Sequence, residues 1–441
     1  MADFDEILSK VKEDKVEEIV LQFTDVIGST KSVYFPVSQL NDSLENGTWF
    51  DGSSIEGFAR IHESDMFLKP DPSTYAVFPW NPKTARFICD VFFPDGKPFS
   101  GDPRFILKKA VAKAKEKGFV FNTGPELEFF LFENPNGTVK PVPHDTGSYF
   151  DFSSRDLASN VRSKIVSFLS QLNVKVESSH HEVAFGQHEI DFEYRDALTT
   201  ADRTLTFKQT VKSVASSFDL FASFMPKPVF GINGSGMHVH QSLSDLNGKN
   251  LFFDSSFKHG LSELAMQFIA GQLLHIKAMS AILSPTVNSY KRLVPGFEAP
   301  VNICWATINR SALIRVPRIF PGKESSARIE LRCPDPSSNP YLAFAVMLEA
   351  GLDGIEKKLK PDKAVEEDVY DFSDEKLAEL NISTLPFSLS LALTELEKDE
   401  VIKNALGEKL LESFLKAKKA ECLEYNIQVS EWELKKYFHL F

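Results

Sequence analysis

Three observations predict an α+β protein with a small N-terminal domain followed by a larger one. The chain has 441 residues, which is long for a single domain. Strand-like segments before residue 100 are followed, from Gly124 onward, by strands that alternate with helical segments. These later strands carry polar residues on one face, which favours an α+β fold over a regular βαβ repeat.

The first hundred residues contain short apolar segments between polar turns. Their pattern predicts a helix at 5–14, strands at 17–23, 31–37 and 86–93, and a loop rich in glycine and serine at 47–55.

A helix start marks the expected domain boundary. Asp102 suits an N-cap and Pro103 suits the first helical position, and the helix is expected to end before Gly118. We therefore expect domains at 1–101 and 102–441. Further helices are expected near 157–172, 200–222, 258–283, 339–358, 386–396 and 407–426.

Composition and charge exclude several classes of protein. The net charge of −12 argues against a general nucleic-acid binder and against binding to anionic membranes. No signal peptide is visible, and no apolar run reaches about 18 residues, so no transmembrane helix is expected. The cysteines, Cys89, Cys304, Cys333 and Cys422, form no CxxC pair. A reduced, cytoplasmic setting without structural zinc is expected.

Four short segments place acids and histidines on one face of probable strands. Side chains at i and i+2 of a strand point the same way. Converging carboxylates need counter-charge, and oxygen-rich ligation suits magnesium or manganese. Arginines beside such a site indicate an anionic substrate. The segments are Glu126 and Glu128 in PELEFF, Glu182 and Glu189 in HHEVAFGQHEIDF, His238 and His240 in NGSGMHVH, and Glu330 between Arg328 and Arg332 in RIELR.

A zinc-dependent hydrolase is the alternative from another class of enzyme. The HHE sequence at 180–182 resembles the start of a zinc-protease helix, but an HExxH motif needs a histidine where the chain has Phe185. Zinc sites favour histidine and cysteine, whereas this set is dominated by carboxylates.

Two further segments suit a phosphate-bearing substrate. The glycines at 233–240 allow close backbone approach, although no Walker A loop is present. Arg310 and Arg315 lie in β-like apolar sequence, which predicts partly buried guanidinium groups with anionic partners. The proline and glycine residues of the VPGFEAP segment at 294–300 are typical of a mobile flap, and this flap would carry Glu298. Together these parts suit phosphoryl transfer, where catalysis is mainly positioning and charge neutralisation.

The motifs together resemble type I glutamine synthetase, essentially from end to end. The matching segments are FDGSSIEGF (50–58), GPELEFF (124–130), NGSGMH (233–238), NSYKRLVPGFEAP (288–300) and NRSALIR (309–315). The resemblance implies a β-grasp domain and a catalytic domain whose antiparallel sheet forms the active-site funnel. It implies a homododecamer of two hexameric rings, with active sites between neighbouring subunits and a C-terminal helical segment between the rings.

The resemblance also implies the reaction and its cofactors. ATP-dependent ligation of ammonia to L-glutamate gives L-glutamine, ADP and phosphate through γ-glutamyl phosphate, with two or more Mg²⁺ or Mn²⁺ ions per site. Carried over by position, the metal ligands are Glu128, Glu182 and Glu189 for one ion, and Glu126, His238 and Glu330 for the other. Glutamate is expected at Asn233, Gly234, Arg292, Glu298, Arg310 and Arg332. ATP is expected at Glu177, Tyr194, His240, Ser242, Arg315 and Arg328.

The implied chemistry needs an ammonium pocket and a closed site. A carboxylate is a poor electrophile until phosphorylation gives it a phosphate leaving group, and Arg310 would help neutralise the phosphoryl group in transfer. Asp51, from a neighbouring subunit, and Glu298 would supply the negative charge that favours binding and deprotonation of ammonium. The flap would keep water from hydrolysing the intermediate.

Two positions concern regulation. The adenylylated subgroup carries a tyrosine before Leu-Pro, whereas this chain reads NISTLPFSL with Ser383 and Thr384, so no adenylylation is expected. Arg60, after the EGF motif, matches an arginine of the short α-type subgroup that takes part in feedback inhibition by glutamine. Small regulatory proteins commonly act on this family, but no residue identifies one.

Two alternatives share the fold. A γ-glutamyl-amine or polyamine ligase would be expected to lose the ammonium pocket, yet Asp51 and Glu298 are present. A non-catalytic structural relative would be expected to have gaps among the metal ligands, and the sequence shows none.

Overall fold

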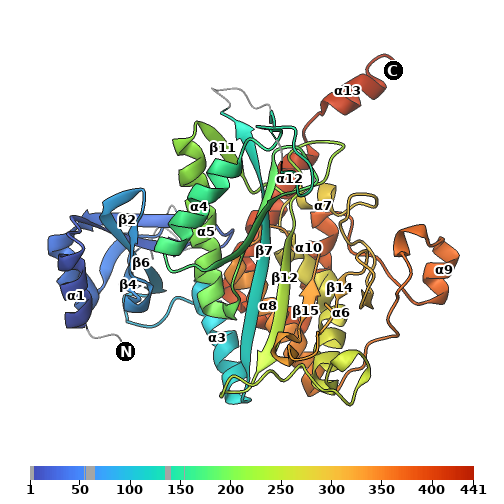
Figure 1. Cartoon of the computed structure of the whole chain (residues 1–441), viewed down its shortest axis with the longest axis horizontal. Coiled ribbons are helices and arrows are strands. Elements are labelled where there is room, and N and C mark those ends of the chain that lie inside the picture. The colour runs from blue at the N-terminus through green and yellow to red at the C-terminus, as the bar shows by residue number, and fades with distance from the viewer. Residues whose placement is uncertain (1–3, 54, 56–64, 135–140, 153) are drawn as a thin grey trace.

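The chain forms two sheets that lie side by side, the smaller one built from the N-terminal residues (Figure 1). A computed structural model describes residues 1–441 except 1–3, 54, 56–64, 135–140 and 153. The smaller sheet has the strand order β2-β1-β6-β4-β3, with β5 paired to β6. The larger sheet has the order β13-β14-β15-β12-β7-β9-β8, with β10 and β11 also paired to β7.

The smaller sheet is a β-grasp arrangement centred on the parallel pair β1 and β6. Ile19, Leu21 and Phe23 of β1 are buried in one core with residues of the helices α1 and α2, because they share the face of the strand that the helices cover. The elements are α1 (Phe4–Glu13), β1 (Glu18–Thr24), β2 (Thr30–Pro36), α2 (Leu40–Asn46), β3 (Thr48–Asp51), β4 (Asp65–Pro70), β5 (Ala76–Phe78) and β6 (Asn81–Phe92).

The expected helix at the domain boundary is present as α3 (Pro103–Glu116). The Asp102 side chain accepts a hydrogen bond from the Arg104 N–H at 2.9 Å, which caps the helix, and Pro103 occupies its first turn. This confirms the predicted helix start.

The larger sheet is antiparallel apart from the β13–β14 pair, and β7 is its organising strand. With 14 residues, β7 pairs with β12 and β11 along one edge and with β9 and β10 along the other. The strands are β7 (Val120–Glu133), β8 (Val176–His181), β9 (Gln187–Phe192), β10 (Arg195–Asp196), β11 (Leu220–Ser223), β12 (Met237–Ser244), β13 (Trp305–Ala306), β14 (Ile314–Arg315) and β15 (Ile329–Leu331).

Helices cover the apolar face of this sheet. Leu127, Phe129 and Leu131 of β7 are fully buried in one core with residues of the helices. Because successive strand residues alternate between faces, the intervening Glu126 and Glu128 face away from that core. The helices are α4 (Ser159–Gln171), α5 (Ala197–Ser217), α6 (Glu263–Leu283), α7 (Ser289–Arg292) and α8 (Pro340–Glu356).

The pair α6 and α8 forms the centre of the helical layer. A Cβ atom on Gly271 would lie 2.1 Å from the Ala350 carbonyl oxygen, so glycine permits this close approach. Among the described residues, α6 alone is long and apolar enough to span a membrane by length and composition. In the structure 72% of that stretch is buried, as expected for a core helix.

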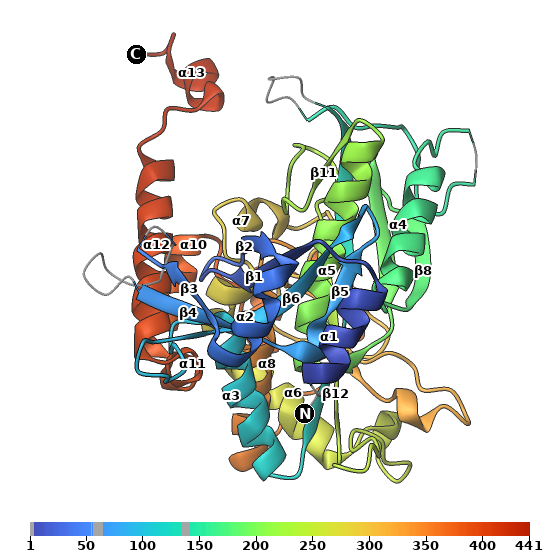
Figure 2. The ribbon, with the colours of Figure 1, turned by 90° about the vertical axis from the view of Figure 1, so that its left-hand side faces the viewer.

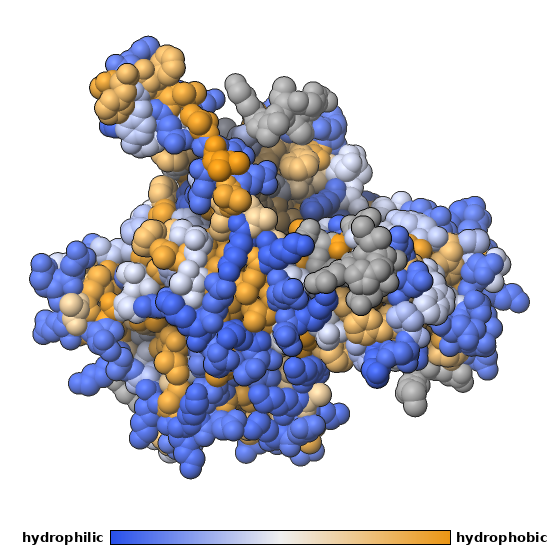
Figure 3. Space-filling model, turned by 180° about the vertical axis from the view of Figure 1, so that it is seen from behind, coloured by the Kyte–Doolittle hydropathy of each residue, from blue (hydrophilic) through white to orange (hydrophobic). Residues whose placement is uncertain are grey.

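The C-terminal part is helical and ends in a projecting arm (Figure 2). Its helices are α9 (Asp374–Glu379), α10 (Leu389–Lys398), α11 (Glu400–Leu406), α12 (Glu408–Asn426) and α13 (Glu431–Tyr437). The arm beyond α12 carries exposed apolar side chains, visible at the upper left of Figure 3, among them Ile427, Trp432, Phe438 and Phe441.

Several sequence predictions differ from the structure. The segment expected as a loop at 47–55 contains β3, whose Trp49 and Phe50 pair with β4, so aromatic strand propensity outweighed the glycine and serine residues. The helix expected at 200–222 ends at Ser217, and the next residues form β11 on the edge of β7. The four cysteines are free, as expected.

A buried arginine joins the two sheets. The side chain of Arg104 is 3% exposed and binds Asp71 (2.8 Å) and Asp90 (2.7 Å) of the first sheet region, and Asp202 of α5 (3.0 Å). Tyr341 of α8 donates to the same Asp202 at 2.6 Å. Arg104 therefore fixes the smaller sheet against the helical layer of the larger one.

We expect Arg104→Met to lower the free energy of unfolding by about 3–5 kcal/mol, because it leaves three neighbouring carboxylates without their buried cation. Lys108→Met is the control, because Lys108 binds Asp90 from a more exposed position and should contribute about 1 kcal/mol or less. Urea denaturation followed by circular dichroism measures both. Equal losses in the two variants would contradict a special role for Arg104.

Candidate active site

The candidate site is built from rows of side chains that cross the polar face of the larger sheet. Strand pairing places His180 opposite Glu189, and Glu189 opposite Glu128, across β8, β9 and β7. The next row places Asp191 opposite Glu126, and Glu126 opposite His238, across β9, β7 and β12. A third row places His240 of β12 opposite Glu330 of β15, and Glu330 opposite Arg315 of β14. Antiparallel pairing thus brings segments far apart in sequence onto one surface.

The first cluster is made of three acids, Glu128, Glu182 and Glu189. One carboxylate oxygen from each lies within 4.8 Å of the others. Glu128 accepts hydrogen bonds at 2.9 Å from Gln187 Nε2 and from the Gly236 N–H. Burial, and then the neighbouring Glu182 carboxylate, raise the pKa of Glu128 to about 8. Burial, followed by Asp191 and Glu128, raises the pKa of Glu189 well above its ordinary value. Arg292 and Arg332 act in the opposite direction on Glu128 but do not offset burial and the neighbouring acid, and a divalent cation would relieve this excess of negative charge.

The second cluster combines two acids and a histidine, Glu126, His238 and Glu330. One ligand atom from each again lies within 4.8 Å of the others. Glu330 is fully buried between Arg315 and Arg332, and the Arg332 Nη1 donates at 2.6 Å. Burial alone would raise the pKa of Glu330, but Arg332 and the other nearby cations lower it to about 2.

Glu126 is ionised for a related reason. Burial opposes its charge, but hydrogen bonds from His238 and His240 hold the pKa of Glu126 well below its ordinary value. The second cluster is therefore already compensated by cations and donors, whereas the first is not.

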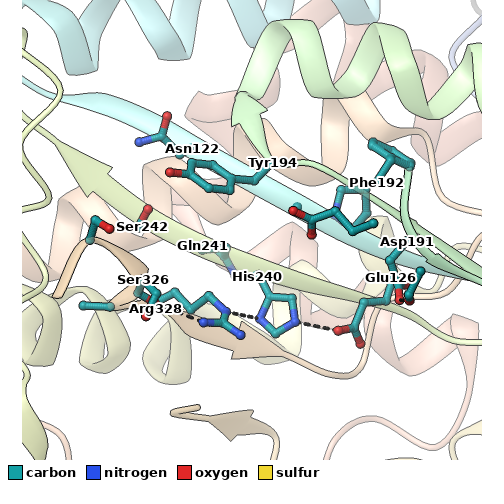
Figure 4. Close-up of a pocket in the computed structure, with 16 residues that line it drawn as sticks. Asn122, Glu126, Asp191, Phe192, Tyr194, His240, Gln241, Ser242, Ser326 and Arg328 are labelled. Carbon is teal, nitrogen blue, oxygen red and sulfur yellow. Dashed lines mark hydrogen bonds and ion pairs between the residues drawn. The ribbon is translucent and has the colours of Figure 1, made fainter. Parts of the chain in front are cut away.

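His240 links the second cluster to a neighbouring arginine. Its Nδ1 accepts from Arg328 Nε at 3.2 Å, so its Nε2 carries the proton and donates to Glu126 at 2.7 Å. The ring is thus held as one neutral tautomer between Arg328 and Glu126 (Figure 4).

A cavity of about 440 Å³ opens beside Glu126, with Tyr194 on one side and the Arg328–His240 pair on the other (Figure 4). Gly124 lines this cavity, and a Cβ atom on it would lie 3.1 Å from the Tyr194 Cβ. Five of the six predicted nucleotide contacts line this cavity, namely Glu177, Tyr194, His240, Ser242 and Arg328. The sixth, Arg315, binds Glu330.

The residues expected to bind glutamate lie toward the first cluster. A Cβ atom on Gly234 would lie 2.2 Å from the Pro226 carbonyl oxygen, so only glycine fits there. Gln187 Nε2 donates to the Gly234 carbonyl at 3.0 Å as well as to Glu128, which ties this segment to the cluster. Arg292 is buried and donates to the carbonyl oxygens of Arg332 and Cys333.

The flap residue Glu298 is exposed and adopts a positive φ of 56°. Asn233 Nδ2 donates to its carboxylate at 3.3 Å. Burial and then the Glu182 charge raise the pKa of Tyr149, and the charges of Arg310 and Glu298 also act on that hydroxyl. Tyr149, Glu182, Arg310 and Glu298 therefore lie close enough for their charges to interact. Arg310 lies on an exposed turn, so the expectation that its guanidinium is partly buried was wrong.

Two predicted residues lie elsewhere. Asp51 is exposed at the end of β3, the edge strand of the smaller sheet, and accepts from the Ser53 N–H at 2.8 Å. It does not belong to the larger sheet that carries the carboxylates. Arg60 lies outside the described residues.

Sequence reasoning missed four residues of this surface. Asp191 and His180 join Glu189 in a third group of possible ligands, and Asp191 also lines the cavity. The i+2 spacing from Glu189 to Asp191 could have shown this. Tyr149 and Gln187 come from a turn and a strand start, and only the fold shows where they point.

Comparison with known proteins agrees with this arrangement. The catalytic-domain model of glutamine synthetase matches residues 100–437, and its β-grasp-domain model matches residues 15–94. A glutamine synthetase of Clostridium saccharobutylicum is 50% identical over 439 residues, covering 99% of this chain and 98% of that protein. One of Halobacterium salinarum is 50% identical over 440 residues, covering 99% and 96%.

Solved structures show the same fold. One described as a GmaS/ADP complex has a TM-score of 0.91 and 34% identity, covering 100% of both chains. A glutamine synthetase of Plasmodium falciparum has a TM-score of 0.88 and 29% identity, covering 99% of both chains. Both domain models of the family match this chain, in the same order, and about half of its residues are identical to those of full-length relatives. The chain therefore belongs to the glutamine synthetase family.

Proposed function

We propose that this member of the glutamine synthetase family ligates ammonia to L-glutamate at the polar face of the larger sheet, through γ-glutamyl phosphate. The observation that carries this proposal is the adjacency of three features on one surface. A nucleotide-sized cavity adjoins the second cluster at Glu126, and the first cluster lies one row further along β7. The charges of the buried Arg292 and Arg332 act on Glu128 of that cluster. A phosphoryl donor and an acid acceptor can thus meet across the two clusters.

Both clusters fit divalent cations. Glu128, Glu182 and Glu189 would hold one ion, and Glu126, His238 and Glu330 would hold the other. When bound, such ions neutralise the transferring phosphoryl group and orient it for in-line transfer. Because the ligands are mostly carboxylate oxygens, we propose Mg²⁺ or Mn²⁺ as the physiological ion.

The chain's own residues hold the two substrates. Tyr194 and Ser242 would contact the nucleotide, together with Glu177 and His240, while Arg328 and Arg315 face its phosphates. The backbone around Gly234 and Asn233 would receive the amino acid, and Arg332 and Arg292 would bind its charge. Arg310 would reach the phosphoryl group from the exposed turn.

The ammonium pocket would be completed by a second copy of the chain. Asp51 lies on an exposed edge strand, away from the carboxylates of its own chain. We propose that Asp51 of a neighbouring subunit and Glu298 of the flap together bind ammonium and favour its deprotonation. The exposed apolar arm after α12 would join subunits between the two rings of a dodecamer.

The remaining assignments rest on the sequence. We propose a division into domains at 1–101 and 102–441, and a cytoplasmic location. Ser383 and Thr384 stand where adenylylated relatives carry tyrosine, so we propose that the chain is not adenylylated.

Phosphate release tests the choice of nitrogen substrate. We expect release from ATP and glutamate to depend on ammonium, and glutamine to form in equal amount. The same assay with methylamine and with a polyamine distinguishes a γ-glutamyl-amine ligase. Release that required an organic amine and ignored ammonium would reject the assignment.

Glu298→Ala tests the flap acid. We expect ammonium-dependent turnover to fall by roughly 100-fold or more, because a proton-accepting carboxylate is lost and the intermediate is exposed to water. Glu375→Ala removes an exposed acid of α9 and serves as the control. Steady-state kinetics with varied ammonium measures both, and an unchanged rate in Glu298→Ala would show that the residue has no part in the reaction.

Glutamine titration tests feedback control. We expect millimolar glutamine to inhibit the wild-type enzyme and Arg60→Ala to relieve that inhibition. Lys69→Ala removes an exposed cation of the same domain and should leave inhibition unchanged. Activity that is insensitive to glutamine in the wild type would contradict the proposal.

A further inference from the structure

A buried polar pair lies behind the β8–β9 hairpin, on the side away from the acid clusters. Strand pairing places His181 opposite His188 and His188 opposite Phe129, which faces the core. The side chains of His181 and Asp145 are both 0% exposed, and His181 Nε2 lies 2.9 Å from Asp145 Oδ1. Buried ionisable groups are costly unless they are paired, so this pair requires a reason within the structure.

His181 connects this buried layer to a cluster acid. Its Nδ1 donates to the backbone carbonyl of Glu182 at 2.7 Å, while its Nε2 donates to Asp145. Because both ring nitrogens face oxygen atoms, the ring bridges Asp145 on one side and the Glu182 backbone on the other. Glu182 is the first residue after β8, so its position depends on this contact as well as on its own backbone N–H bond to the Gln187 carbonyl at 2.8 Å.

Asp145 fixes the rest of the hairpin turn. It accepts from the Gly186 N–H at 2.9 Å, and from the N–H groups of Gly147 and Leu157. Gly186 adopts a φ of 65°, and a Cβ atom there would lie 2.8 Å from the Leu131 carbonyl oxygen. The turn that carries Glu182 is therefore held from both ends by one carboxylate.

Gly147 shows how closely the pair is packed. A Cβ atom on Gly147 would lie 2.4 Å from His181 Nε2 and 2.6 Å from Cδ2. The backbone of this segment thus presses against the imidazole ring, and any larger residue must displace the ring that holds Glu182.

The buried pair and the neighbouring His188 form an unfavourable site for a cation. Asp145, His181 and His188 could offer three ligand atoms within 4.8 Å. However, both His181 nitrogens already contact oxygen atoms, and the Arg162 guanidinium lies 3.0 Å from His188 Nδ1. Arg162 is itself paired with Asp156 at 2.7 Å. Positive charge is already supplied here, so the trio suits a supporting role.

The Glu182 carboxylate itself contacts His180 Nε2 at 2.9 Å and accepts from the Val183 N–H at 3.0 Å. We propose that Asp145 and His181 are positioning residues that hold the backbone of Glu182 from behind the hairpin, so that this carboxylate is in place for metal binding. This inference rests on the proposed metal role of Glu128, Glu182 and Glu189. Outer partners that orient a metal ligand commonly change affinity by about 10–100-fold when they are removed.

Manganese titration of the assembled enzyme, without nucleotide or glutamate, tests the proposal by calorimetry and by electron paramagnetic resonance of free Mn²⁺. We expect His181→Gln and Asp145→Asn to weaken one of the two metal sites about 10-fold and to leave the other within about twofold. A purely structural role would lower thermal stability without selecting one site. His144→Gln, a change of the same type on the adjoining segment, is the control.

Glu182→Gln separates this inference from the proposed function. If Glu182→Gln leaves both Mn²⁺ sites unchanged, the metal assignment itself is wrong. If Glu182→Gln weakens one site while His181→Gln and Asp145→Asn do not, only the positioning role is rejected. Should His181→Gln fail to assemble, Gly147→Ala decides, because it displaces the ring without removing any polar group, and normal metal binding in that variant overturns the proposal.

Discussion

The register of β7 between β9 and β12 is the constraint on which the site depends. Backbone hydrogen bonds along both edges fix which residue of each neighbour lies opposite Glu126 and Glu128. A shift of one residue would turn both acids into the helical core and expose Leu127 and Phe129. Burial of that apolar row against the helices therefore specifies the position of the acids as strongly as any polar contact does.

The two acid clusters differ in how their charge is balanced. Glu330 and Glu126 remain ionised because arginines and histidines surround them, as the lowered pKa of Glu330 shows. Burial, with the nearby Glu182, raises the pKa of Glu128 to about 8, because the charges of Arg292 and Arg332 do not offset these two effects. A bound divalent cation would replace protons in the first cluster. In the second cluster it would add positive charge to that of the arginines already present. The first cluster therefore depends more on the exact placement of its ligands.

That dependence gives the reverse side of the hairpin its importance. Glu182 follows the end of β8 and is joined to β9 by its N–H bond to the Gln187 carbonyl, whereas Glu128 and Glu189 lie within continuous strands. A buried hydrogen-bonded pair can make a turn more rigid, because any other conformation of the turn would leave buried polar groups without partners, at a high cost in free energy. Glu128 is fixed in a similar way by Gln187, which also binds the Gly234 carbonyl.

The sequence by itself indicated which acids and histidines to propose as ligands, because alternating acids in an apolar strand are a local pattern with a period of two. It also indicated the helix start at Asp102, because an N-cap is a local pattern too. It also indicated the family, through motifs spread over the whole chain. Only the tertiary structure decided which acids meet: pairing of β7 with β9 and with β12, which are distant in the sequence, made two unequal clusters and added Asp191 and Gln187. It also placed Asp51 in the other sheet, exposed Arg310, and turned the expected loop at 47–55 into an edge strand. These outcomes depend on long-range pairing and burial, which no local pattern encodes.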